Sequence, residues 1–142
     1  MSNVKNILII DAQGGGVGKQ LVSAIKKDLP TLHVTAVGTN SAATSAMLKA
    51  GADQAATGEN AVVVCARTAD VILGPVGIVI ADSLLGEITP AMATAVGQSR
   101  AKRILIPLNQ CDNIIAGVPD LNLAALIQSA IATLRALVET PC

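Results

Sequence analysis

The stretch Asn6–Lys27, NILIIDAQGGGVGKQLVSAIKK, decides the fold of this chain. The aliphatic run Ile7–Ile10 predicts a buried strand, and Leu21, Val22 and Ile25 follow at helical spacing. Between them lie four glycines: Gly14, Gly15, Gly16 and Gly18. A strand that enters a helix through such a turn leaves backbone N–H groups free at the positive end of the helix dipole, an anion site used most often for phosphate. The stretch therefore predicts a nucleotide-type ligand, without indicating a reaction.

The glycine loop departs from both common phosphate-binding motifs. A Walker A loop needs a glycine five residues before its Gly-Lys pair and a Ser or Thr after it. Gly18 and Lys19 supply the pair, but Gln13 and Gln20 occupy the other two positions. The dinucleotide motif G-x-G-x-x-G fails by one residue in either register, because Lys19 or Gln13 stands where a glycine is required. The loop therefore favours a Rossmann-like site over an Mg²⁺-dependent hydrolase, and a tight turn without a ligand remains open.

Composition sets limits on the class of protein. The 142 residues predict one domain, residues 1–142, and a net charge of zero gives no sign of nucleic acid or of an anionic membrane as partner. The mean hydropathy of +0.59 is high, yet no apolar run reaches the roughly 18 residues of a membrane span. The surplus apolar surface predicts a subunit interface, hence a homodimer.

The chemistry-bearing residues are few. Cys65, Cys111 and Cys142 have no metal or disulfide spacing and predict reduced thiols in a cytoplasmic protein. The chain has no Phe, Tyr or Trp, which excludes tyrosine-dependent dehydrogenase chemistry and disfavours flavodoxin-style FMN binding. The single histidine, His33, falls near the start of a predicted strand, at the wrong end of the sheet for a catalytic triad. No metal site and no catalytic residue are assigned.

The rest of the chain alternates predicted strands and helices, which is typical of a parallel sheet. Strands are predicted at 7–10, 32–37, 54–56, 71–73, 103–107 and 113–117; helices at 18–28, 41–50, 60–69, 90–99 and 122–138, with a helical turn or two over 78–85. Three valines favour a strand in 60–69, but the alternation calls for a helix there. The fold class is a Rossmann-like three-layer α/β/α sandwich with a mostly parallel sheet of five to six strands.

Polar residues and glycines follow the strands, where open parallel sheets bind their ligands. The predicted ligand-binding residues are Asp11, Gln13, Gly14, Gly15, Gly16, Val17, Gly18, Lys19, Thr39, Asn40, Ser41, Thr57, Glu59, Asn60, Gly74, Gly77 and Asn109. Each residue type also builds turns and caps helices, so their convergence is what predicts a site.

The end of the second strand bears on the ligand. An NAD site usually has an acidic residue there, whereas this chain has Thr39-Asn40-Ser41. Their hydroxyl and amide groups favour NADP over NAD, although no arginine stands beside them, and a mononucleotide or a small phosphorylated metabolite stays open. Lys19 is the only cation predicted near the site.

Four other residues have roles that the sequence leaves between alternatives. Asp11 either binds a metal or braces the glycine loop by accepting backbone N–H bonds, and we favour bracing. Asp82 and Glu87 are either helix caps or general bases. Cys111 is interpreted as a buried, inert thiol.

Five blocks of the sequence resemble a bacterial family known as a domain of unknown function, number 3842. They are AQGGGVGK (12–19), VGTNSAATSAMLKAGAD (37–53), ATGENA (56–61), GPVGI (74–78) and LGEITPAMA (85–93). The resemblance covers most of the chain and departs from the family at Ala12, where the family has glycine. It implies a Rossmann-like nucleotide-binding fold and supplies neither an activity nor catalytic residues.

Three functional hypotheses follow. The first is a binding or sensor module for a small anionic or nucleotide ligand, with NADP as the favoured dinucleotide. The second is a small enzyme that acts on a phosphorylated metabolite or uses NADP(H), with Asp11, Lys19, Glu59 or Asp82 as working groups. The third is a degenerate P-loop nucleotide hydrolase, which Gln20 disfavours.

Overall fold

The computed structural model describes residues 4–108, 113–118 and 122–140, in which strands and helices alternate. The strands are β1 (Asn6–Asp11), β2 (His33–Gly38), β3 (Gln54–Thr57), β4 (Val71–Pro75) and β5 (Lys102–Ile106). The helices are α1 (Gly16–Asp28), α2 (Ser41–Lys49), α3 (Glu59–Ala66), α4 (Pro90–Gln98) and α5 (Leu123–Glu139), with a 3₁₀ helix, η1 (Val76–Val79), after β4.

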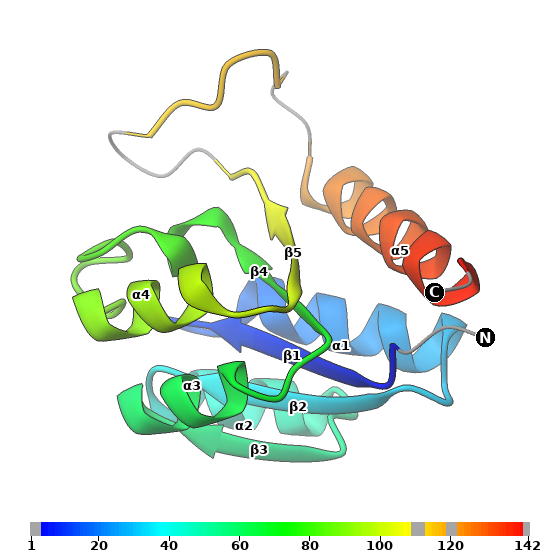
Figure 1. Cartoon of the computed structure of the whole chain (residues 1–142), viewed down its shortest axis with the longest axis horizontal. Coiled ribbons are helices and arrows are strands. Elements are labelled where there is room, and N and C mark those ends of the chain that lie inside the picture. Colours follow the sequence, from blue (N-terminus) through cyan, green and yellow to red (C-terminus); the bar gives the residue numbers. More distant parts are fainter. Residues whose placement is uncertain (1–3, 109–112, 119–121, 141–142) are drawn as a thin grey trace.

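The five strands form one sheet in the order β3-β2-β1-β4-β5, and each neighbouring pair is parallel. Helices α1, α2 and α5 cover one face, and α3 and α4 cover the other (Figure 1). This confirms the predicted Rossmann-like three-layer α/β/α architecture.

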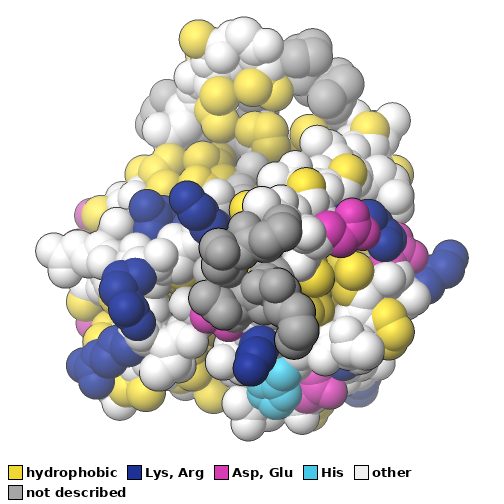
Figure 2. Space-filling model, turned by 45° about the vertical axis from the view of Figure 1, so that its right-hand side comes forward, with side chains coloured by type: hydrophobic (Ala, Val, Ile, Leu, Met, Phe, Trp, Pro, Cys, Tyr) yellow, Lys and Arg dark blue, Asp and Glu magenta, His cyan; other side chains and the backbone are white. Residues whose placement is uncertain are grey.

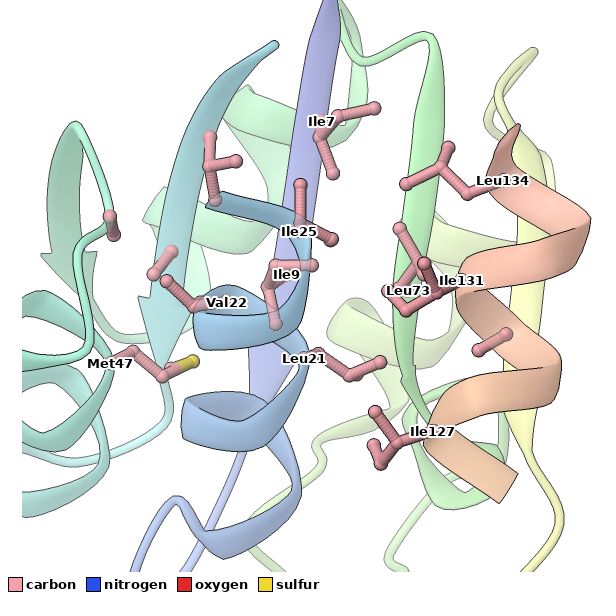
Figure 3. Close-up of a cluster of buried hydrophobic side chains, with 14 of the residues drawn as sticks. Ile7, Ile9, Leu21, Val22, Ile25, Met47, Leu73, Ile127, Ile131 and Leu134 are labelled. Carbon is pink, nitrogen blue, oxygen red and sulfur yellow. The ribbon is translucent and has the colours of Figure 1, made fainter. Parts of the chain in front are cut away.

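The aliphatic run of β1 explains why the sheet is covered on both faces. Ile7 and Ile9 point towards α1 and α5, whereas Leu8 and Ile10 point towards α3 and α4, and all four are at most 1% exposed. A parallel strand buried on both sides reads as a continuous apolar run instead of an alternating one. Figure 3 shows the hydrophobic cluster on the side of α1 and α5, with Leu73 of β4 beside the apolar stripe of α5.

The predicted helix over 60–69 is confirmed as α3. Its valines do not form a strand because the segment presents one buried side, with Val62 fully buried and Val64 45% exposed. Such a pattern suits a helix that packs one stripe onto a sheet. None of the helices in the described ranges is long and apolar enough to cross a membrane.

The sixth strand, predicted over 113–117, is wrong. Asn113 forms an isolated bridge, Ala116 and Gly117 form a turn, and Ile114 is 89% exposed. Two neighbouring isoleucines alone do not provide an alternating face that a sheet could bury. The predicted helical turns over 78–85 are also shifted, since the 3₁₀ helix ends at Val79 and turns follow it.

Candidate functional site

The carboxyl ends of β1 and β2 lie side by side at one edge of the sheet. Asp11, the last residue of β1, pairs with Gly38, the last residue of β2. The backbone N–H of Thr39 then donates to the carbonyl oxygen of Asp11 at 3.0 Å. This brings the glycine loop between β1 and α1 next to the start of α2, as the topology predicts.

Asp11 holds the glycine loop from inside. Its side chain is 5% exposed; Oδ1 accepts from the backbone N–H of Ala12 at 2.8 Å, and Oδ2 accepts from that of Gly18 at 2.6 Å. Burial raises the pKa of Asp11, while hydrogen bonds from Gly18, Ala12 and Val17 act in the opposite direction. The carboxylate thus accepts hydrogen bonds from backbone N–H groups in the first turn of α1 and braces the loop.

Two glycines of the loop are required by the fold. Gly15 has a φ of 73°, and a Cβ there would lie 3.0 Å from the backbone of Ala43 in α2. A Cβ on Gly18 would lie 2.5 Å from the sulfur of Met47 and 2.9 Å from the Cβ of Asp11. These positions stay glycine because α1 lies close to β1 and α2.

At positions 14 and 16, by contrast, the fold does not require glycine. A Cβ built on either would meet nothing within 4 Å, and neither has a left-handed φ. Within the described part of the chain, neither backbone N–H donates to another residue. The outer side of the loop is therefore open at these two positions.

Glu87 reaches this edge from the turn between η1 and α4. Its Oε1 accepts from the Thr39 hydroxyl at 2.6 Å, from Asn40 Nδ2 at 2.8 Å and from the Gln13 backbone N–H at 3.0 Å. These hydrogen bonds, the one from Thr39 first, lower the pKa of Glu87. Glu87 does not cap α4, because the N-cap of that helix is Thr89, whose hydroxyl oxygen accepts from the backbone N–H of Met92 at 3.1 Å.

The sequence singled out Glu87 but did not place it in the site. The available signal was its position as one of two acids, with Asp82, in a long apolar span. Asp82 itself lies in the turn that presents Glu87: its φ is 66°, and its N–H donates to the carbonyl oxygen of Ile88 at 2.7 Å.

The residues that follow β2 are engaged within the protein. Asn40 caps α2 by accepting from the N–H of Ala43 at 2.9 Å, and its Nδ2 also donates to the carbonyl oxygen of Gln13 at 3.0 Å. Ser41 is exposed. The donors of Thr39 and Asn40 therefore position Glu87 and the glycine loop.

Apart from Gly74 and Gly77, the remaining predicted residues divide into three groups. Thr57 makes a 2.7 Å hydroxyl contact with Thr44, and Glu59 and Asn60 are exposed at the start of α3. Lys19 is exposed and lines a groove of about 660 Å³ between α1 and α2. Asn109, like Cys111, lies outside the described residues.

Close packing explains why glycine stands at positions 74 and 77. A Cβ on Gly74 would lie 2.4 Å from the carbonyl oxygen of Ile10, and one on Gly77 would lie 2.9 Å from Ser83 Oγ. Both glycines thus have a reason within the fold.

Comparison with known proteins places the chain in a family. The model described as Domain of unknown function (DUF3842) matches residues 6–139. The chain belongs to this family. No curated protein matches it. Among solved structures, a dodecameric FMN-dependent Ubix-like decarboxylase from Escherichia coli O157:H7 is similar, with 18% identity and a TM-score of 0.44 over 93% of this chain and 77% of that one.

The network around Glu87 predicts a pH-dependent stability. Because the folded pKa lies below the unfolded value, Glu87 stabilises the fold above its ordinary pKa of about 4.3, and this contribution disappears as the pH falls through the folded pKa. Glu87→Gln should therefore be less stable than wild type at neutral pH, with a difference that shrinks towards about pH 3. Urea unfolding followed by far-ultraviolet circular dichroism measures it.

The comparison with the variant is needed because other carboxylates titrate in the same range. The pKa of Asp53 is also lowered, mainly by the N–H of Val34 and then by Lys26, whereas that of Asp11 is raised. Both remain in the variant, so subtracting the two curves removes the share of Asp53 and leaves the share of Glu87 together with its electrostatic coupling to Asp11. A difference that does not change with pH would contradict an ionised, hydrogen-bonded Glu87.

Proposed function

We propose that this protein binds a nucleotide or dinucleotide on the outer side of the β1–α1 loop and acts as a binding or sensor module. The observation that carries the proposal is the contrast between its glycines. Gly15 and Gly18 are explained by contacts with α2 and β1, whereas Gly14 and Gly16 are explained by nothing in the described chain.

Two such glycines in a strand-to-helix turn, where backbone N–H groups are free, favour a close approach by a ligand. Glycine loses more backbone freedom on folding than alanine, roughly 0.5–1 kcal/mol per position, so an open site gains nothing from it in the free protein. In nucleotide-binding loops, glycine lets the backbone approach a phosphate. The N–H groups of Gly14 and Gly16 are the donors of this loop that no described residue accepts, since Asp11, Glu87 and the carbonyl oxygen of Ala12 take the others.

Substituting these glycines tests the proposal. Gly14→Ala/Gly16→Ala should weaken nucleotide binding by roughly tenfold or more, because a methyl group would occupy the approach path. The stability should stay equal or rise slightly, since neither methyl group meets another atom. Titration calorimetry with ADP, NADH and NADPH, together with urea unfolding, measures both effects.

Gly97 in α4 offers a matched control. A Cβ there also meets nothing within 4 Å, so Gly97→Ala should gain stability without changing the affinity. Equal affinities of the double variant and wild type for every nucleotide that binds would contradict a phosphate on this side of the loop.

A ligand retained during purification is simple to detect. The chain has no Phe, Tyr or Trp, so its own near-ultraviolet absorbance is very low. A purine band in a sample cleared of nucleic acid, followed by mass spectrometry, would identify the bound nucleotide. FMN would be visible in the same spectrum.

Binding is favoured over catalysis by the state of the groups that an enzyme would use. Asp11 is engaged with backbone amides, Asp82 lies in a turn, and Lys19 and Glu59 are exposed. No hydrogen bond or ion pair joins any two of these four within the described residues. The structure therefore supplies no assembled acid–base pair among them.

The proposal includes a homodimer in the cytoplasm. Leu85 and Ile114 are about nine-tenths exposed, at 91% and 89%, and exposed apolar side chains of this size suit a subunit interface. In the upper part of the face that Figure 2 shows, hydrophobic side chains lie among uncharged white atoms, and most charged side chains lie below them. Light scattering of the purified chain would give the subunit number.

A further inference from the structure

The carboxylate of Glu87 lies where the sequence lacks an acidic residue. In NAD sites, an Asp or Glu at the end of the second strand binds the ribose hydroxyls. Here that strand is followed by Thr39 and Asn40, and both donate to Glu87 Oε1. A residue from the turn before α4 thus brings a negative charge to the position that the end of β2 leaves neutral.

One oxygen of this carboxylate is available. The three donors, from Gln13, Thr39 and Asn40, all bind Oε1, and no described residue donates to Oε2. Carboxylate oxygens are acceptors only, so a ligand group that binds Oε2 of Glu87 must be a hydrogen-bond donor. A sugar hydroxyl is such a donor, whereas a phosphate oxygen at neutral pH is not.

The same contacts engage the hydrogen-bond donors that a 2′-phosphate would need. The hydroxyl of Thr39 donates to Glu87, and the two N–H bonds of the Asn40 amide go to Glu87 and to the carbonyl oxygen of Gln13. All ten lysines and arginines lie in the described residues, and none of them pairs with Glu87. The buried carboxyl group of Asp11 lies near enough to interact with Glu87 electrostatically.

We infer that Glu87 selects a nucleotide whose ribose carries free hydroxyl groups and rejects one with a 2′-phosphate, so that the ligand class is NAD(H) or an ADP-type nucleotide and not NADP(H). This rests on the proposed nucleotide site at the neighbouring loop. It reverses the preference that Thr39-Asn40-Ser41 suggests when read from the sequence alone, because the sequence does not show that Glu87 uses those donors.

Two matched pairs of nucleotides test the inference on the wild-type chain: NADH against NADPH, and ADP against its 2′-phosphorylated form. The free-ribose member of each pair should bind roughly tenfold tighter or better, because a phosphate would bring a like charge beside Glu87. The ADP pair shows whether the effect depends on the nicotinamide half. Equal or tighter binding of the phosphorylated members overturns the inference.

Glu87→Gln removes the charge and keeps an acceptor for Thr39. In this variant the preference should fall to about threefold or less, since the repulsion by Glu87 itself is gone. Glu139→Gln, an exposed site in the last turn of α5, makes the same charge change away from this edge and should keep the wild-type ratio. An unchanged ratio in Glu87→Gln overturns the role of Glu87.

The outcomes also separate this inference from the proposed function. If Gly14→Ala/Gly16→Ala weakens both members of a pair while Glu87→Gln leaves their ratio unchanged, the loop site stands and the selection by Glu87 falls. If none of the four nucleotides binds the wild-type chain at millimolar concentration, the proposed adenine-nucleotide site falls, and the inference falls with it.

Discussion

Gly74→Ala should lower the free energy of unfolding by about 3 kcal/mol or more. The added Cβ would lie 2.4 Å from the carbonyl oxygen of Ile10 and 3.1 Å from Cδ1 of Ile78. The first of these atoms belongs to the backbone of β1, which is paired with β2 on one side and β4 on the other, so it has little room to move. Urea unfolding followed by circular dichroism measures the loss.

Two other glycines make this a graded series. A Cβ on Gly77 would meet the side chain of Ser83, which can rotate, so Gly77→Ala should lose clearly less stability than Gly74→Ala. Gly97→Ala, with open space around its Cβ, should gain up to about 1 kcal/mol. If Gly74→Ala were as stable as Gly77→Ala, β1 and β4 would have to separate more easily than their parallel pairing indicates.

The order of strands and helices could be predicted because it depends on local patterns. The aliphatic run before the glycine loop and the Thr89-Pro90 helix start both mark elements that the structure contains. The strand predicted over 113–117 is wrong because a local pattern alone does not provide a partner to pack against. Ile114 and Ile115 satisfy a local apolar pattern, but Ile114 is exposed, so no face of the sheet is there to bury it.

The site was predictable in position and not in detail. The carboxyl ends of parallel strands meet at one edge, so Asp11 and Asn40 could be expected near each other. Glu87 is 74 residues from Gln13 and arrives through a turn in which Leu84 and Leu85 have positive φ. Non-glycine residues rarely adopt this conformation, so no sequence pattern announces it.

The roles of the four loop glycines also required neighbours from elsewhere in the chain. Gly15 and Gly18 are fixed by Ala43 and Met47, which belong to α2. The sequence shows four equivalent residues, and only the packing of α2 against the loop divides them into two that the fold requires and two that it leaves open.

Asp11→Ala should lower the free energy of unfolding by about 3 kcal/mol. The substitution removes the acceptor of the Ala12 and Gly18 N–H groups, and also that of Val17, at a site where the side chain is 5% exposed. A buried N–H without an acceptor costs about 1–3 kcal/mol, and the sum is reduced because ionised Asp11 is itself costly to bury. Urea unfolding at neutral pH measures the loss.

Asp11→Asn distinguishes loss of the acceptor from loss of the charge. The amide of the asparagine keeps one oxygen that can accept from the Gly18 N–H, but its NH₂ group then faces the Ala12 N–H, which is also a donor. The stability of this variant should therefore lie between those of wild type and Asp11→Ala. Since the folded pKa of Asp11 is raised, wild type loses stability as the pH rises from about 3.9 through that value, whereas Asp11→Asn lacks this loss. The deficit of Asp11→Asn should therefore be smaller at neutral pH than near pH 3. If Asp11→Ala were as stable as wild type, the loop would be held by Glu87 and Asn40 alone, and Asp11 would not brace it.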